Sequence, residues 1–265
     1  MKSFAGMAMV VVSAVTLVAG CASSPTESAP TTSGTASSPG INGDVTVFAA
    51  ASLQSTFTEL GDQFKKDNPG TGVTFSFAGS SDLVTQLTQG APADVFASAD
   101  EKNMAKATEA GLVAGAPINF ASNTLTIVTM PGNPKGIASF ADLAKPGTQV
   151  VVCARQVPCG SATEKVEKAT GVTLAPVSEE TAVTDVLGKI TSGQADAGLV
   201  YVTDAAGAGD KVTSVPFPES GGAVNIYPIA LLKGSKNTAA AQKFVDLVTG
   251  PEGRKVLAAA GFAAP

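Results

Sequence analysis

Several predicted turns in this chain carry small or hydroxyl-bearing residues where a strand gives way to a helix. The clearest example ends at Ser52, which follows an apolar segment and three alanines. Small residues allow the backbone to approach a ligand closely. A serine at a helix start presents its hydroxyl beside the free N–H groups of the first turn. Such a turn can bind an anion without a positively charged side chain.

Four more turns share this character, and none of them contains lysine or arginine; they occupy 78–81, 158–161, 181–183 and 201–203. A serine at a helix start is usually only a cap. However, ligands of open α/β sheets bind beyond the carboxyl ends of the strands, where such turns converge. Together the turns predict a cage of neutral hydrogen-bond donors for an anion. We interpret the nearby Arg155 as a solvated loop charge.

The composition excludes several other kinds of site. The chain has no histidine, so a Ser-His-Asp triad is impossible and the commonest metal ligand is missing. The sequence also lacks Gly-x-Ser-x-Gly, Ser-x-x-Lys and Walker-type motifs. We therefore predict that the protein is not an enzyme, binds no free metal cation and needs no cofactor. A net charge of −5 without a basic cluster argues against nucleic acid as a partner.

Strand and helix patterns alternate from residue 44 onward. The predicted strands are 45–48, 73–77, 95–97, 125–129, 149–153, 199–202 and 224–232. The predicted helices are 52–67, 81–89, 101–110, 139–143, 161–169, 182–191, 239–248 and a last one from Pro251. This alternation predicts an α/β fold with mixed, mostly parallel sheets flanked by helices.

The predicted elements favour two lobes over a single sheet. Extended segments at 120–123 and 226–228 lack turn residues, as the two strands of a hinge would. The first lobe is then predicted to contain 44–121 and 229–265, and the second 122–228.

The N-terminal region is predicted to be a processing segment. A basic residue and a short apolar run precede LVAGC at 17–21, which resembles a bacterial lipobox. We predict a signal peptide at 1–20, a lipid anchor at Cys21 and a flexible Ser/Thr/Pro-rich linker at 21–43. The alternative is an ordinary secretory signal with a chance cysteine. The protein is expected outside the cytoplasm, lipid-anchored to the bacterial cell membrane and attached to it in no other way.

Two further cysteines, Cys153 and Cys159, lie close together in the sequence. In an oxidising compartment such a pair favours a disulfide. Two small buried thiols are the alternative.

Four segments resemble the family of periplasmic molybdate-binding proteins, the solute receptors of molybdate ABC importers. They read VFAAASL at 47–53, SFAGSS at 76–81, GAPADVFASAD at 90–100 and GLVY at 198–201. The resemblance extends over essentially all of 44–262. It implies a two-lobed, type II periplasmic-binding-protein fold with a two-segment hinge. The implied ligand is molybdate or tungstate, bound as an oxyanion. The implied partners are a membrane permease and its cytoplasmic ATPase, and a monomer is expected.

The resemblance also implies a set of ligand-binding residues. Ser52 and Ser80 would donate from hydroxyls and backbone N–H groups, Cys159 and Val183 from backbone N–H groups, and Tyr201 from its phenol. The family usually has alanine where Cys159 stands, which a backbone donor tolerates. Taken singly, the serines could be helix caps, Val183 a core residue and Tyr201 a filler between the lobes. A receptor for another oxyanion such as sulfate is the alternative function.

Overall fold

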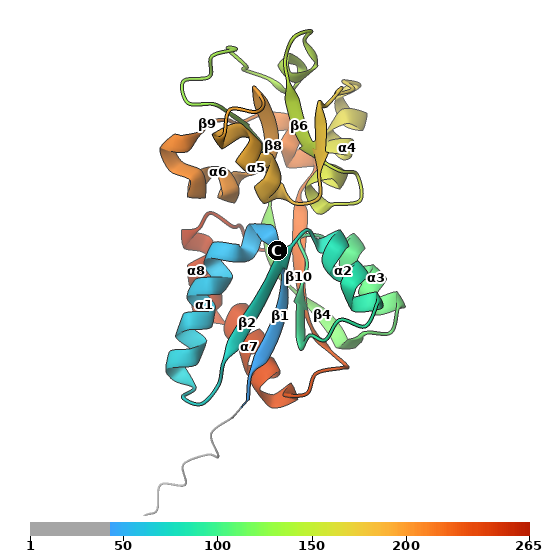
Figure 1. Cartoon of the computed structure of the whole chain (residues 1–265), viewed down its shortest axis with the longest axis vertical. Helices are drawn as coiled ribbons and strands as arrows, with labels where there is room; N and C mark the ends of the chain where they lie inside the picture. Colours follow the sequence, from blue (N-terminus) through green and yellow to red (C-terminus); the bar gives the residue numbers. More distant parts are fainter. Residues whose placement is uncertain (1–42) are drawn as a thin grey trace, which may run out of the picture. The chain divides into compact units, whose positions relative to one another are not determined.

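The computed structural model describes residues 43–265, which form two five-stranded sheets flanked by helices (Figure 1). The predicted signal peptide, Cys21 and the linker up to residue 42 lie outside the described residues. Within the described part of the chain, no helix combines the length and apolar character needed to span a bilayer. The predicted α/β class with mixed sheets is confirmed.

The first sheet has the strand order β2-β1-β3-β10-β4. Its strands are β1 (Val45–Ala50), β2 (Val73–Ala78), β3 (Val95–Ala97), β4 (Val113–Asn123) and β10 (Asn225–Leu232). Strand β1 is parallel to β2 and β3, whereas β10 is antiparallel to β3 and β4. Its helices are α1 (Gln54–Asp67), α2 (Ser80–Thr88), α3 (Glu101–Glu109), α7 (Thr238–Thr249) and α8 (Pro251–Ala259).

The second sheet has the order β7-β6-β8-β5-β9. Its strands are β5 (Leu125–Thr129), β6 (Val150–Cys153), β7 (Ser178–Glu180), β8 (Ala197–Tyr201) and β9 (Thr213–Val215). Strand β6 is parallel to β7 and β8, and β5 is antiparallel to β8 and β9. Its helices are α4 (Pro158–Thr170), α5 (Val183–Thr191) and α6 (Val202–Ala208). In each sheet the carboxyl ends of the parallel strands therefore lie at the same edge, and the helices that follow those strands begin there.

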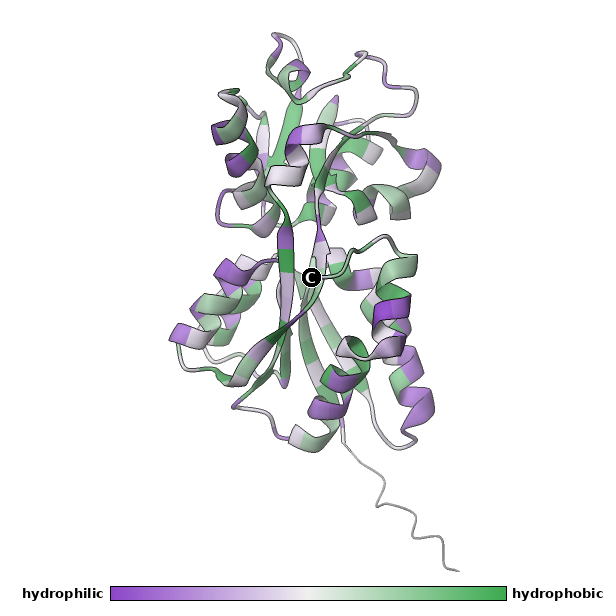
Figure 2. Cartoon of the chain, turned by 180° about the vertical axis from the view of Figure 1, so that it is seen from behind, coloured by the Kyte–Doolittle hydropathy of each residue, from purple (hydrophilic) through white to green (hydrophobic). Residues whose placement is uncertain are grey.

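Strand β1 shows why helices cover both faces of the first sheet. Its alternating residues Val45 and Val47 pack with the α1 and α7 phenylalanines Phe57 and Phe244. Phe48 points the other way and packs with residues of α2 and α3. Figure 2 shows hydrophobic residues along the strands and hydrophilic residues on the outer helix faces. A strand buried on both faces fits the nearly continuous apolar run of its sequence.

The observed elements differ from the predicted ones mainly at their ends. A 3-10 turn at Ala51–Leu53 precedes α1, and α4 begins at Pro158, three residues before the predicted start. Proline suits the first helical position because it has no N–H to leave unbonded. The segment predicted as a helix at 139–143 is a 3-10 turn, Phe140–Ala144. Strands β7 and β9 and helix α6 were not predicted.

Two strands of the first sheet lead to and from the second. Strand β4 ends at Asn123, with one residue between it and β5, and β10 starts at Asn225, which pairs with Asn123. The division into lobes at 121/122 and 228/229 stays a prediction.

Candidate functional site

All five predicted ligand residues line one small cavity between the two sheets. The cavity is small, with about 190 Å³ of empty space that includes open solvent. Its wall consists of Ala50, Ala51, Ser52, Gly79, Ser80, Ala99, Val157, Pro158, Cys159, Val183 and Tyr201. No charged side chain is among these wall residues, which all belong to the described part of the chain. The geometry suits a small ligand held by neutral groups.

Three helices begin at this cavity with unbonded backbone donors. In each helix, the first backbone N–H that bonds to the carbonyl of the residue before the helix belongs to Asp82 in α2, Ser161 in α4 and Asp185 in α5. The N–H groups that precede them carry no bond within their helices. Ser80, Cys159 and Val183 lie within these first turns. The partial positive charge of a helix N-terminus adds to the attraction of each turn for an anion.

The hydroxyls of the two serines at the cavity each make a hydrogen-bond contact to another protein group. The Ser80 Oγ accepts a hydrogen bond of 3.0 Å from the backbone N–H of Ala99, so its own hydrogen is available to a ligand. The Ser52 Oγ lies 3.0 Å from the Tyr227 hydroxyl. Ser52 lies inside the 3-10 turn and makes no cap bond. Neither serine therefore acts only as a helix cap.

The Tyr201 phenol is buried beside the Tyr227 ring, with 5.9 Å between ring centroids. Its oxygen accepts a 3.0 Å hydrogen bond from Nδ2 of Asn225. Burial, together with the nearby Tyr227, Asp100 and Asp204, raises the pKa of Tyr201 well above its usual value. Tyr201 therefore stays protonated and can donate a hydrogen bond.

Cys159 forms a disulfide with Cys153, with an Sγ–Sγ distance of 2.03 Å and a Cα–Cα distance of 5.6 Å. The bond joins the end of β6 to the first turn of α4. Between the cysteines, the Val157 N–H donates to the Ala154 carbonyl at 2.9 Å. The turn that presents the Cys159 N–H is thus closed both covalently and by a backbone hydrogen bond.

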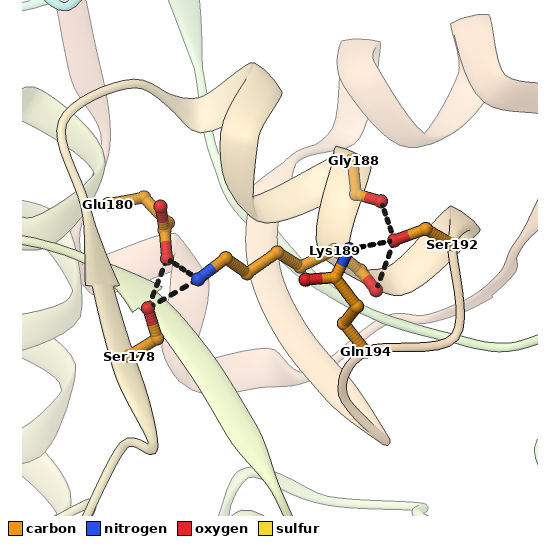
Figure 3. A network of polar contacts seen from close by, with 6 residues as sticks. All are labelled: Ser178, Glu180, Gly188, Lys189, Ser192 and Gln194. Carbon is orange, nitrogen blue, oxygen red and sulfur yellow. Dashed lines mark hydrogen bonds and ion pairs between the residues drawn. The ribbon is translucent and has the colours of Figure 1, made fainter.

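The turn that presents Val183 lies between β7 and α5 and is held by a polar network (Figure 3). The Lys189 ammonium lies 2.6 Å from a Glu180 carboxylate oxygen and 2.6 Å from the Ser178 hydroxyl, which also bonds to Glu180. Burial raises the pKa of Glu180, but the bonds from Lys189 and Ser178 outweigh it, and the pKa is lowered. The ion pair therefore fixes β7 to α5 on both sides of the turn.

Two partly or fully buried carboxyl groups stand behind the donors. Asp100 caps α3 by accepting from the Asn103 N–H at 2.8 Å, and burial raises its pKa although bonds from Asn103 oppose the shift. Asp204 accepts from the Tyr201 N–H at 3.0 Å, and burial raises its pKa to about 7. Asp204 is half-buried as a whole residue, while its carboxyl group is enclosed by protein.

The two halves of the structure, each made of one sheet and its helices, touch across the cavity. A Cβ atom placed on Gly79 would lie 1.9 Å from the backbone oxygen of Thr181, which leaves room only for glycine. Beside this contact, Nδ2 of Asn103 donates to the carbonyl of Gln156 at 3.3 Å.

Several contributors were not found from the sequence, whereas Arg155 behaves as predicted. Its exposed guanidinium pairs with Glu164 at 3.2 Å and does not line the cavity. Asn225 and Tyr227 were missed as parts of the site, and Gly79 was predicted only as a member of the 78–81 turn. Two features of the sequence could have pointed to the missed residues. Asn225 is a single amide in an otherwise apolar strand, and Tyr227 is one of only two tyrosines in the chain.

The GAPAD segment has a structural role. Asp94 accepts hydrogen bonds from the Thr46 N–H at 2.7 Å, the Ser235 hydroxyl at 2.7 Å and the Lys236 N–H at 3.1 Å. It thereby ties β1 to the turn after β10.

Comparison with known proteins finds extensive similarity over the folded region. Residues 45–263 match the model of the family described as bacterial extracellular solute-binding protein. The molybdate-binding protein ModA of Mycobacterium tuberculosis is 61% identical over 221 residues, which cover 83% of this chain and 85% of that protein. ModA of Escherichia coli is 32% identical, covering 83% and 89% of the two chains. The solved periplasmic molybdate-binding protein of Azotobacter vinelandii is 26% identical, with a TM-score of 0.72 over 83% of this chain and 99% of that one.

Proposed function

The chain belongs to the family of bacterial extracellular solute-binding proteins, and we propose that it captures molybdate or tungstate for an ABC importer. Members of this family are non-enzymatic components of transport. The observation that carries the proposal is the cavity, whose wall brings together hydroxyls and free backbone N–H groups without a charged side chain. The similarity to molybdate-binding proteins supports the choice of ligand.

A tetrahedral dianion suits such a cavity because its oxygens only accept hydrogen bonds. Roughly five to seven bonds to a charged ligand, each of about 1.5–3 kcal/mol, give about 10–20 kcal/mol. Immobilising the two partners costs about 4–15 kcal/mol, so affinities between about micromolar and nanomolar are expected. Tungstate has nearly the same size and should bind as well. Sulfate matches in charge but is smaller, so the size of the closed cavity must discriminate against it.

The proposed residues are Ser52, Ser80, Cys159, Val183 and Tyr201, in the roles that the family resemblance implies. Capture would close the halves around the anion by a hinge at β4 and β10. The closed, monomeric protein would dock on a permease driven by a cytoplasmic ATPase. Cys21 would anchor it by a lipid to the outer face of the bacterial cell membrane.

Titration calorimetry on protein freed of bound anions tests the function. We expect one molybdate per chain, a similar affinity for tungstate, and weak or absent binding of sulfate and phosphate. Comparable binding of sulfate would make the protein a general oxyanion receptor. If none of the four anions binds, the proposal is contradicted.

A further inference from the structure

Asn225 stands behind the cavity at the point where both halves meet. It is the first residue of β10 and only 5% exposed. Its side-chain nitrogen Nδ2 lies 2.8 Å from the Ala99 carbonyl, 3.0 Å from the Tyr201 hydroxyl and 3.3 Å from the Pro158 carbonyl. Asn225 is not part of the cavity wall, so it can act on a ligand only through these neighbours.

The surroundings of Asn225 fix which end of its amide faces them. Backbone carbonyl oxygens cannot donate, so the amide must turn its NH₂ group toward Ala99 and Pro158. The same NH₂ group faces the Tyr201 oxygen. Tyr201 is therefore the acceptor in this contact, whichever way its own hydrogen points.

This contact restricts the direction of the Tyr201 hydrogen. In a phenol, the hydrogen and the main acceptor lone pair lie in the ring plane on opposite sides of the oxygen. With Asn225 on the acceptor side, the hydrogen is left for the cavity or for the hydroxyl of Tyr227, whose ring packs beside that of Tyr201. A bound anion wins this competition because charge-assisted hydrogen bonds are about twice as strong as neutral ones.

Asn225 is also linked to the donor on the opposite wall. Ala99 accepts from Asn225 through its carbonyl and donates to the Ser80 oxygen through its N–H. The Ser80 oxygen, like that of Tyr201, thus has an acceptor position filled by protein. One buried amide is connected to a hydroxyl in each half.

We propose that Asn225 is a positioning residue that holds Tyr201 as a hydrogen-bond donor and so favours fully deprotonated oxyanions over anions that carry a proton. The inference rests on the proposed function. Hydrogenphosphate brings a donor of its own and needs an acceptor in the wall. As long as Asn225 occupies the Tyr201 lone pair, the phenol cannot provide one.

A double-mutant cycle between Asn225 and Tyr201 separates positioning from a general structural role. Molybdate is titrated into the wild type, Asn225→Ala, Tyr201→Phe and the double variant, with thermal unfolding measured on each. We expect Asn225→Ala to weaken binding about tenfold in the wild type, the value of one hydrogen bond. In the Tyr201→Phe background it should weaken binding by less than about twofold. An equal loss in both backgrounds would overturn the inference.

Asn103→Ala is the matched control. Asn103 is also a buried asparagine that bonds across the two halves, to the Gln156 carbonyl, but it contacts no cavity hydroxyl. Its effect on affinity should be the same with and without the Tyr201 hydroxyl. If the Asn225 and Asn103 variants behave alike, Asn225 only holds the halves together.

A second variant covers the case in which Asn225→Ala fails to fold. Asn225→Ser keeps a polar side chain but has one hydrogen, so it cannot serve a carbonyl and Tyr201 together. We expect the ratio of phosphate to molybdate affinity to rise at least about fivefold, because the phenol is freed to accept. An unchanged ratio would overturn the inference alone. A wild type that does not bind molybdate would overturn the proposed function and this inference with it.

Discussion

The helix starts of the two sheets bring different kinds of donor to the same cavity. In the first half, the turns carry Ser52 and Ser80, whose hydroxyls are held by Tyr227 and by the Ala99 N–H. In the second half, the corresponding positions are Cys159 and Val183, which can offer only backbone N–H groups. A backbone donor does not depend on its side chain, but it does depend on where its turn is held.

The interactions that hold these turns in place also differ between the two halves. The turns of the second half are fixed by a disulfide and by the Glu180–Lys189 ion pair. Those of the first half are fixed by hydrogen bonds to the hydroxyls themselves. Among the helix-start turns, side-chain changes should therefore impair binding in the first half. In the second half, apart from the Tyr201 phenol, only changes that move the backbone should do so.

The largest effect is expected from Asp204, the carboxyl behind Tyr201. Its pKa rises from the usual 3.8 to about 7 on folding, so between these values the folded protein holds a proton that the unfolded chain has released. The free energy of unfolding should therefore fall as the pH rises from about 4 to 7, by up to about 4 kcal/mol, and level off above. Denaturant titrations between pH 4 and 8 measure this slope.

Asp204→Asn keeps an oxygen for the Tyr201 N–H and should remove most of that slope. Part of it should remain, because the pKa of Asp100 is raised in the same direction. Asp210→Asn, at an exposed position, is the control for the change in charge. If Asp204→Asn leaves the slope unchanged, the pH dependence arises elsewhere.

Gly79→Ala tests the contact between the halves. Its backbone angles of −59° and 140° suit alanine, but the new Cβ would meet the Thr181 oxygen. The halves would have to stay apart, so we expect molybdate affinity to fall at least about a hundredfold, or about 2.7 kcal/mol, with thermal stability nearly unchanged. Gly188→Ala, where a Cβ meets nothing within 4 Å, should bind normally. Normal binding by Gly79→Ala would show that capture does not need this contact.

Ser80→Ala and Val183→Ala compare the two kinds of donor directly. Loss of the Ser80 hydroxyl should weaken molybdate binding by about 2 kcal/mol, as for a hydrogen bond to a charged group. Val183→Ala keeps its N–H and should change affinity by less than about 0.5 kcal/mol, although removal of buried methyl groups lowers stability. Calorimetry and thermal unfolding on both variants separate the effects. Equal losses of affinity would contradict the distinction between the halves.

The smallest effect on binding is expected from the disulfide. Replacing Cys153 and Cys159 with alanine opens a loop with a sequence separation of 6. Loop entropy then predicts a loss of about 2 kcal/mol in unfolding free energy. Affinity should fall by less than about tenfold, or 1.4 kcal/mol, because the α4 N-terminus remains. Intact mass before and after reduction confirms the bond in the wild type. A loss as large as that of Gly79→Ala would show that the disulfide, rather than the helix, positions the donor.

Much of the fold and site could be predicted because local patterns carried them. Small and hydroxyl residues marked the helix starts near Ser80, after an apolar strand, and near Val183, and the family resemblance selected five of the residues that line the cavity. Strand β4 was recognised only at its end, because Gly115 and Pro117 resemble chain breakers. They are tolerated because β4 lies at the edge of its sheet, next to β10. Strands β7 and β9 are short edge strands that exist through their pairing.

The sequence by itself determined the donors: neutral residues at helix starts, no histidine and no basic side chain among them. The tertiary structure decided how those donors are aimed. Asn225 meets Ala99 and Tyr201 across 126 and 24 residues of sequence, and Ser52 meets Tyr227 across 175. A local pattern fixes which groups can donate because that is a property of residue type and helix geometry. The direction of a hydroxyl hydrogen depends on the partner that fills its lone pair, and only folding brings that partner into place.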